Sequence, residues 1–161
     1  MPHSATLIGS TVLLASLATL PVAPTHAVLL GRHSQNQAAT VIASSATGPL
    51  AKQLQGKPVV VDIYASWCPA CRNIAPTLSV LRQQYGNRVH FVVLDVSDKA
   101  KVEASMSTAQ KLGLAAFFAA NKTQTGMVAI IDPATGKIMA QHRNNATATA
   151  YTSVLNKALA K

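Results

Sequence analysis

The chain contains little cysteine, few aromatic residues and few acidic residues, and each shortage excludes a class of protein. Its 161 residues include two cysteines, which excludes a disulfide-dense scaffold and a four-cysteine zinc site. Aromatic residues make up 4% of the chain, so the core must rest on valine, isoleucine, leucine and alanine. The length allows one domain, and a hydrophobic share of 49% excludes a disordered chain.

Acidic residues are outnumbered, because 5 Asp and Glu oppose 14 Lys and Arg, for a formal net charge of +9. The basic residues form no run and no aromatic residues are interleaved with them, so nucleic acid is not an expected partner. We expect a solvated basic surface, with attraction to an anionic membrane surface or to acidic partners as the alternative. His33, His90 and His142 are scattered, no pair of them has ligand spacing, and no metal site is expected.

Charge is absent from the first part of the chain: residues 1–31 contain no Lys, Arg, Asp or Glu. Within them, Leu7–Leu20 is a mostly apolar run that is short for a membrane span and typical in length of a signal-peptide core. Pro21 and Pro24 end the run, and the segment Thr25-His26-Ala27 resembles a cleavage site. The pattern indicates export, although the usual positive start is missing.

We therefore predict a signal peptide over residues 1–27, a linker over 28–47 and one domain over 48–161. An uncut membrane anchor that reaches about residue 30 is the alternative to cleavage. Within the linker, Thr40–Ala43 is predicted to form a first short strand.

From Gly48 onward the hydrophobic pattern alternates between strands and helices. The strands Val59–Ala65 and Val89–Asp95 are continuous β-branched or apolar runs, typical of strands buried on both faces. The other predicted elements are a short helix over Pro49–Gln55 capped by Thr47, helices from Cys68 to about Tyr85 and over Asp98–Leu112, strands over Met127–Ile131 and Lys137–His142, and a last helix from Asn145 or Thr147. This order predicts an α/β fold with a mixed central sheet, parallel at first and ending in an antiparallel hairpin.

The chemistry is concentrated in Trp67-Cys68-Pro69-Ala70-Cys71. Cys68 stands where a buried strand gives way to a helix, and Pro69 suits the first helical position. The amino end of the helix favours a Cys68 thiolate, and Cys71 lies one turn away, within reach of a disulfide. An exposed attacking thiolate with a resolving thiol behind it is what dithiol exchange requires. A purely structural disulfide is disfavoured, because so tight a loop constrains little of the unfolded chain.

The surrounding residues extend this motif, reading Val61-Asp62-Ile63-Tyr64-Ala65-Ser66-Trp67-Cys68-Pro69-Ala70-Cys71, with Pro76 five residues after the second cysteine. The pattern resembles the thioredoxin family over about residues 48–161. The presequence and the Pro-Ala dipeptide are most similar to exported, membrane-associated thioredoxin-like proteins of bacteria, of the TlpA-like or thylakoid type. The resemblance implies a location in the periplasm or the thylakoid lumen.

The resemblance further implies the thioredoxin fold and a thiol–disulfide oxidoreductase that reduces protein disulfides. Cys68 would be the nucleophile and Cys71 the resolving thiol, with the buried Asp62 taking the Cys71 proton. Trp67 and Pro76 would shape the site, together with the proline and alanine between the cysteines. No bound cofactor is implied beyond the Cys68–Cys71 disulfide, which a membrane or soluble dithiol protein would supply with electrons.

Two departures from the family pattern stand out. The position of the usual cis-proline is taken by Gly126, after Thr125, which is expected to leave that backbone edge free to take many φ/ψ values. An open site of this kind gives the alternative function, a copper- or zinc-binding or assembly module that uses the same two cysteines. An insertion before the third core strand contains Phe117 and Phe118, which with Thr125 are candidate substrate-binding residues. Alternatively, the two phenylalanines extend the preceding helix and fill the core.

Overall fold

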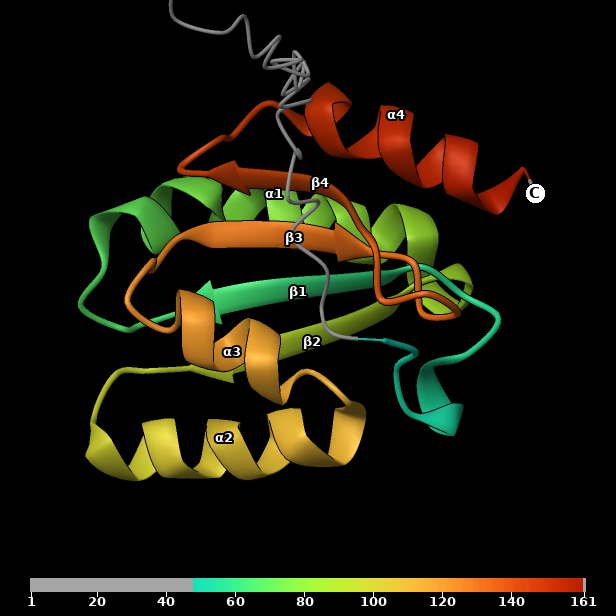
Figure 1. Ribbon diagram of the computed structural model, residues 1–161. Coiled ribbons are helices and arrows are strands. Elements are labelled where there is room, and N and C mark those ends of the chain that lie inside the picture. The colour runs from blue at the N-terminus through green and yellow to red at the C-terminus, as the bar shows by residue number, and fades with distance from the viewer. Residues whose placement is uncertain (1–47, 161) are drawn as a thin grey trace, which may run out of the picture. The chain divides into compact units, whose positions relative to one another are not determined.

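The computed structural model describes residues 48–160, which form a four-stranded sheet with helices on both faces (Figure 1). The elements are η1 Lys52–Leu54, β1 Val59–Tyr64, α1 Pro69–Tyr85, η2 Gly86–Arg88, β2 His90–Asp95, α2 Lys99–Leu112, α3 Ala115–Asn121, β3 Met127–Ile131, β4 Ile138–Arg143 and α4 Ala148–Leu159. The predicted signal peptide, the linker with its short strand, and the Thr47 cap lie outside the described residues. Within residues 48–160, no helix is long and apolar enough to cross a membrane.

The strand order is β2-β1-β3-β4, with β1 parallel to β2 and antiparallel to β3, and β3 antiparallel to β4. The predicted mixed sheet with a closing hairpin is therefore confirmed. Successive residues of a strand point to opposite faces, so β1 supplies Val59, Val61 and Ile63 to one side and Val60 and Asp62 to the other.

The two faces are covered by different helix pairs, with α3 in front of the sheet and α1 behind it in Figure 1. Residues of α2 and α3 pack with Val61, Ile63 and Leu94, whereas residues of α1 and α4 pack with Val60, Val128 and Ile130. Helix α1 buries one stripe: Ile74, Leu78, Leu81 and Tyr85. The spacing i, i+4, i+7, i+11 places these side chains on one helical face.

Two predicted elements are corrected by the structure. The helix over Pro49–Gln55 is reduced to the single turn η1, because the Leu50 N–H donates to the Pro133 carbonyl and the Ala51 N–H to that of Leu112. These bonds hold the incoming segment extended against its neighbours. Strand β2 is not buried on both faces either: it pairs with β1 alone among the described strands, and Val93 is 45% exposed.

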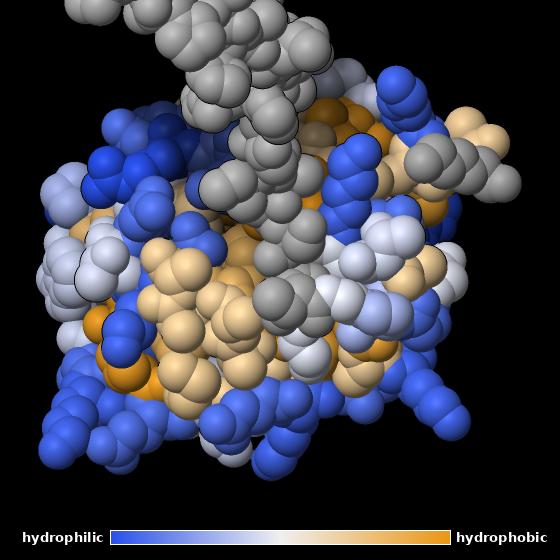
Figure 2. All heavy atoms as spheres, in the orientation of Figure 1, coloured by the Kyte–Doolittle hydropathy of each residue, from blue (hydrophilic) through white to orange (hydrophobic). Residues whose placement is uncertain are grey.

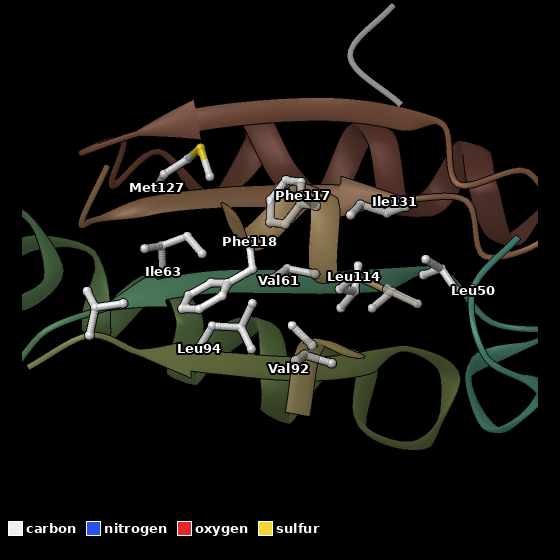
Figure 3. Packing of buried hydrophobic residues seen from close by; sticks show 14 of the residues in the cluster. Leu50, Val61, Ile63, Val92, Leu94, Leu114, Phe117, Phe118, Met127 and Ile131 are labelled. Atoms are coloured by element: carbon white, nitrogen blue, oxygen red, sulfur yellow. The ribbon is translucent and has the colours of Figure 1, made fainter. Parts of the chain in front are cut away.

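The insertion forms a helix of its own and does not extend α2. Gly113 ends α2 with a φ of +77°, and a Cβ there would lie 3.2 Å from the Leu50 Cα, so both conformation and space favour glycine. Phe117 and Phe118 then point from α3 into the core over β1 and β3 (Figure 3), with 3% and 0% of their surfaces exposed. Their burial contradicts the expectation that they contact substrate and supports the packing alternative.

The outer side of α3 consists of exposed alanines, Ala116, Ala119 and Ala120. Figure 2 shows apolar atoms gathered there, above the hydrophilic side chains of α2. The parts of the insertion that remain available to a partner are therefore this alanine surface and the Lys122–Thr125 connection to β3.

Candidate active site

The dithiol lies where β1 ends and α1 begins, as the sequence predicted. Cys68 is the N-cap residue of α1, with an extended φ of −81° and ψ of 118°, and Pro69 occupies the first helical turn. The Cys71 N–H donates to the Cys68 sulfur at 3.2 Å. The cysteine sulfur thus takes the place of the oxygen that usually caps a helix, which favours a negatively charged sulfur.

The environment of Cys68 stabilises its thiolate even though the residue is 2% exposed. Burial by itself pushes the pKa of Cys68 up, but hydrogen bonds from the side chains of Cys71 and Thr125 and from the N–H groups of Cys71 and Ala70 outweigh it, so that this pKa is lowered. Thr125, predicted to bind substrate, is thus found beside the nucleophile. Cys68 is the more acidic of the two thiols.

Cys71 has the opposite character. Its thiol points to the Ile63 carbonyl oxygen, 3.8 Å away, and 3% of the residue is exposed. Burial, followed by the hydrogen bond to Cys68, raises the pKa of the Cys71 thiol to about 11. Cys71 therefore needs a base before it can attack.

Asp62 lies close enough to Cys71 that its charge contributes to the raised pKa of that thiol. Burial raises the pKa of its carboxyl to about 6, while the positive charge of Arg82 acts in the opposite direction. The Oδ1 atom is buried with no hydrogen-bond partner in the structure, which is uncommon for a carboxylate. A cavity of about 220 Å³ is lined by both Asp62 and Cys71.

The loop before the dithiol is held by the turn after β2. The Ser66 N–H donates to the Ser97 hydroxyl at 2.8 Å, and the Trp67 indole N–H donates to the Ser97 carbonyl at 2.9 Å. The Asp95 carboxylate in turn accepts the Ser97 N–H at 2.8 Å. Trp67 remains 59% exposed, so its ring is fixed at the surface next to Cys68.

Gly126 lies against the dithiol, but its backbone edge is not free, contrary to the sequence-based expectation. Its N–H donates to the Ile63 carbonyl and its carbonyl accepts the Asn144 N–H, both at 2.9 Å. Its φ is +76°, and a Cβ would lie 2.5 Å from the Ala70 Cβ. Glycine is required here because the backbone packs directly on the turn between the two cysteines.

A groove of about 400 Å³ opens beside the nucleophile. It lies between Trp67 and the Lys122–Thr125 connection, and its lining residues are Trp67, Val96, Val102, Lys122, Thr123 and Thr125. Pro76, the remaining predicted site residue, lies inside α1 on the exposed side of the helix.

Sequence reasoning missed Arg82 and Ser97. Arg82 had a readable signal, because Cys71, Ala75, Leu78 and Arg82 fall at i, i+4, i+7 and i+11 and so share one helical face. Ser97 had no such signal, because it is 30 residues from Trp67 in the sequence and meets that residue only in the folded chain. Among the residues that the structure describes, no group of three or more His, Cys, Asp and Glu side chains could hold a metal ion.

Comparison with known proteins gives the family. The Thioredoxin family profile matches residues 42–129. A thiol:disulfide interchange protein TxlA homolog of Synechocystis sp. is 38% identical over 86 residues, which is 52% of this chain and 48% of that protein. The chloroplastic thioredoxin-like protein HCF164 of Oryza sativa subsp. japonica is 49% identical over 51 residues, which is 32% of this chain and 19% of that protein. The chain thus spans less than half the length of each relative.

Among solved structures, a thiol:disulfide interchange protein of the thioredoxin family from Chlorobium tepidum TLS is 19% identical, with a TM-score of 0.49 over 73% of this chain and 98% of that one. The profile match covers more than half of the chain and contains β1, the dithiol and all of α1. The chain belongs to the thioredoxin family.

Proposed function

We propose that the chain is a thiol–disulfide oxidoreductase that reduces disulfides in client proteins. The observation that carries this proposal is the contrast between two neighbouring thiols. Cys68 caps α1, accepts the Cys71 N–H at 3.2 Å and has a lowered pKa, whereas burial raises the pKa of Cys71 to about 11. A thiolate next to a protonated thiol is the starting state of disulfide exchange.

In the first step, the Cys68 thiolate attacks one sulfur of the client disulfide. The client S–S bond breaks, a mixed disulfide with Cys68 forms, and the leaving client sulfur departs as a thiolate that takes up a proton. In the second step, Cys71 loses its proton to the Asp62 carboxylate and attacks the Cys68 sulfur. The second client sulfur leaves and is protonated in turn. The client gains two electrons and two protons, and the protein holds a Cys68–Cys71 disulfide.

The cycle closes when another dithiol protein, membrane-borne or soluble, reduces the Cys68–Cys71 disulfide. No resident cofactor enters this scheme, because the electron pair is carried by the two sulfurs. Asp62 supports the reductive direction, since a base for Cys71 speeds release of the reduced client.

Client proteins are proposed to lie along the groove between Trp67 and the connection that contains Lys122 and Thr123. Thr125 in the lining of the groove hydrogen-bonds to Cys68, and the exposed Trp67 indole offers a large apolar contact there. The chain is further proposed to act after export, in the periplasm or thylakoid lumen, on the strength of the uncharged residues 1–31. The net charge of +9 favours an anionic membrane surface nearby.

Trapping experiments test the roles of the two thiols. Cys71→Ser keeps the attacking thiol and lacks the resolving one, so it should accumulate mixed disulfides with insulin or other protein clients on non-reducing gels. Cys68→Ser should accumulate none. If alkylation at mildly acidic pH labels Cys71 before Cys68, the assignment is reversed.

Insulin reduction by the dithiol form, run beside a copper and zinc titration, separates this function from metal binding. Reduction with weak metal binding is expected. Failure to reduce insulin together with stoichiometric metal uptake would overturn the proposal in favour of a metal-binding module.

A further inference from the structure

The cavity beside the resolving thiol contains a cation that the reaction scheme has not used. Besides Asp62 and Cys71, the lining of this cavity of about 220 Å³ includes Arg82 from α1 and Val93 from β2. Val93 pairs in register with Asp62 and is 45% exposed, so the cavity reaches the surface at the open edge of the sheet. Arg82, itself exposed, thus lines the same cavity as the buried carboxyl.

The position of Arg82 is fixed by two features. It lies on the same helical face as Cys71, eleven residues further along α1. Its guanidinium carbon lies 5.5 Å from the centre of the Phe91 ring, within the range of a cation–π interaction. Phe91 and Val93 are two residues apart on β2 and share a face of the sheet. The stacked ring thus keeps the cation at the cavity.

The guanidinium acts on the carboxyl across the cavity and not by contact. Among residues 48–160, the only ion pair within 4.0 Å joins Lys99 and Glu103 on α2. Arg82 and Asp62 therefore form no direct ion pair. A cavity of this size can hold water, and a charge separated from a carboxylate by a few water molecules still stabilises it. An arginine is suited to this role because it stays protonated at every pH of interest.

The other titratable groups that line this cavity are not cations. Cys71 and the Tyr64 ring line the same cavity, and Tyr151 of α4 lies near enough that Asp62 contributes to the raised pKa of its phenol, after burial. His142 of β4 is two strands away, with Val128 between it and Asp62 in register. Arg82 is the one permanently charged cation in the described lining of the cavity.

We propose that Arg82 is a positioning residue for the second step of exchange: its cation keeps Asp62 in the carboxylate form that accepts the Cys71 proton, and so sets the lower pH limit of turnover. The inference rests on the proposed function through the role of Asp62. Burial alone drives the pKa of Asp62 upward, to about 6 with the arginine present. Without the arginine this pKa rises further, and less carboxylate is available on the acidic side of neutrality.

The test measures insulin reduction by the full chain between about pH 5 and pH 9, with dithiothreitol as electron donor. Arg82→Gln should lower turnover by about threefold to fivefold near pH 6 and leave it unchanged near pH 8.5. Arg82→Lys, which keeps the charge, should restore most of the activity near pH 6. Carbon-13 NMR of the Asp62 carboxyl should show a raised pKa in Arg82→Gln.

Arg88→Gln is the matched control. Arg88 is also exposed and also stacks on an aromatic ring, with its guanidinium carbon 5.2 Å from the centre of the Tyr85 ring, but it does not line the cavity. Its removal should shift neither the pH profile nor the Asp62 titration. An equal shift in Arg88→Gln would show that general surface charge, and not the cavity cation, sets the profile.

The background variant Asp62→Asn separates the inference from the proposed function on which it rests. If Asp62→Asn slows turnover and Arg82→Gln adds nothing further in that background, both hold. If Asp62→Asn slows turnover but Arg82→Gln in the native background leaves the profile and the carboxyl titration unchanged, the inference alone fails. If Asp62→Asn leaves turnover unchanged across the range, the proposed role of Asp62 fails and the inference falls with it.

Discussion

The two faces of the sheet bury different kinds of side chain. On the side of α2 and α3, the core is mainly apolar, with Phe118, Leu94 and Ile63 fully enclosed, and its buried Ser105 hydroxyl donates to the Asp95 carbonyl. On the side of α1 and α4, the same strand β1 places Asp62, 5% exposed, among Val60 and Val128 and next to a cavity. One face therefore stabilises the fold, while the other gives up stability to keep a titratable group beside the resolving thiol.

The largest expected effect comes from breaking the apolar face. Phe118→Ala should lower the free energy of unfolding by about 3–5 kcal/mol, because it removes a fully buried ring from a packed core. Urea denaturation measures the loss. Val80→Ala on α1, where the side chain is 50% exposed, is the control and should change stability by less than about 0.5 kcal/mol. Comparable losses in both variants would contradict the packing role of α3.

On the opposite face, removing the charge should stabilise the protein. Since the folded-state pKa of Asp62 is raised from 3.8 to about 6, its stabilising protonated form is fully present below about pH 4 and is lost as the pH rises through 6. Asp62→Asn should therefore be more stable than wild type near pH 7, by up to about 3 kcal/mol, and this advantage should vanish near pH 4. Urea midpoints at the two pH values decide the matter; an advantage independent of pH would mean that Asp62 titrates normally.

The same substitution should slow insulin reduction near neutral pH, because an amide cannot take the Cys71 proton. A variant that is more stable and less active would separate the two uses of this face. A variant that is less stable and equally active would reverse the comparison drawn between the faces.

A third substitution tests the point where both cysteines meet β3. Gly126→Ala places a methyl group 2.5 Å from the Ala70 Cβ at a φ of +76°, so Ala70 and the dithiol turn must shift. We expect a loss of about 2–4 kcal/mol in stability, with a raised pKa of Cys68 as its hydrogen bonds lengthen. Gly126→Pro should cost more still, because proline fixes φ near −65° and removes the N–H that Ile63 accepts.

Gly56→Ala is the control that measures the cost of the positive φ alone, without a steric contact. Gly56 has a similar φ of +81°, but a Cβ there would meet nothing within 4 Å. It should lose about 1–2 kcal/mol and leave thiol reactivity unchanged. Iodoacetamide labelling across pH gives the pKa of Cys68 in each variant. Identical titrations in Gly56→Ala and Gly126→Ala would show that the contact with Ala70 does not affect the Cys68 thiolate.

The sequence predicted what local patterns encode and missed what depends on the assembled sheet. The run Val59–Tyr64, the helix from Pro69 and the cysteine spacing are local, and each lies within a residue or two of its predicted place. Exposure of Val93 follows from β2 being an edge strand, which no local pattern reveals. The sequence does not show whether the side chains of Phe117 and Phe118 point to the core or to solvent. Their direction is set by Gly113, which ends α2 and lets α3 begin separately.

The candidate site divides in the same way. The two cysteines were predicted from their spacing at the junction of a strand and a helix, and Asp62 from the resemblance to the thioredoxin family. The paired backbone of Gly126 was not predicted, because its partners Ile63 and Asn144 belong to other parts of the chain. Arg82 shares a helical face with Cys71, which the sequence does encode, but its place beside Asp62 depends on how α1 packs over β1.

The smallest expected effect concerns the groove at the edge of the apolar face, where the insertion meets the dithiol. Lys122→Gln combined with Thr123→Ala alters one wall of the groove and leaves Trp67 and Cys68 in place. Reduction of insulin should fall about twofold to threefold, since rim contacts contribute little each, while reduction of a small aromatic disulfide should be unchanged. Lys111→Gln, exposed on α2 and outside the groove, is the control for charge. Equal losses for insulin and the small disulfide would show that the wall supports the site geometry, and no loss for either would show that clients approach from another side.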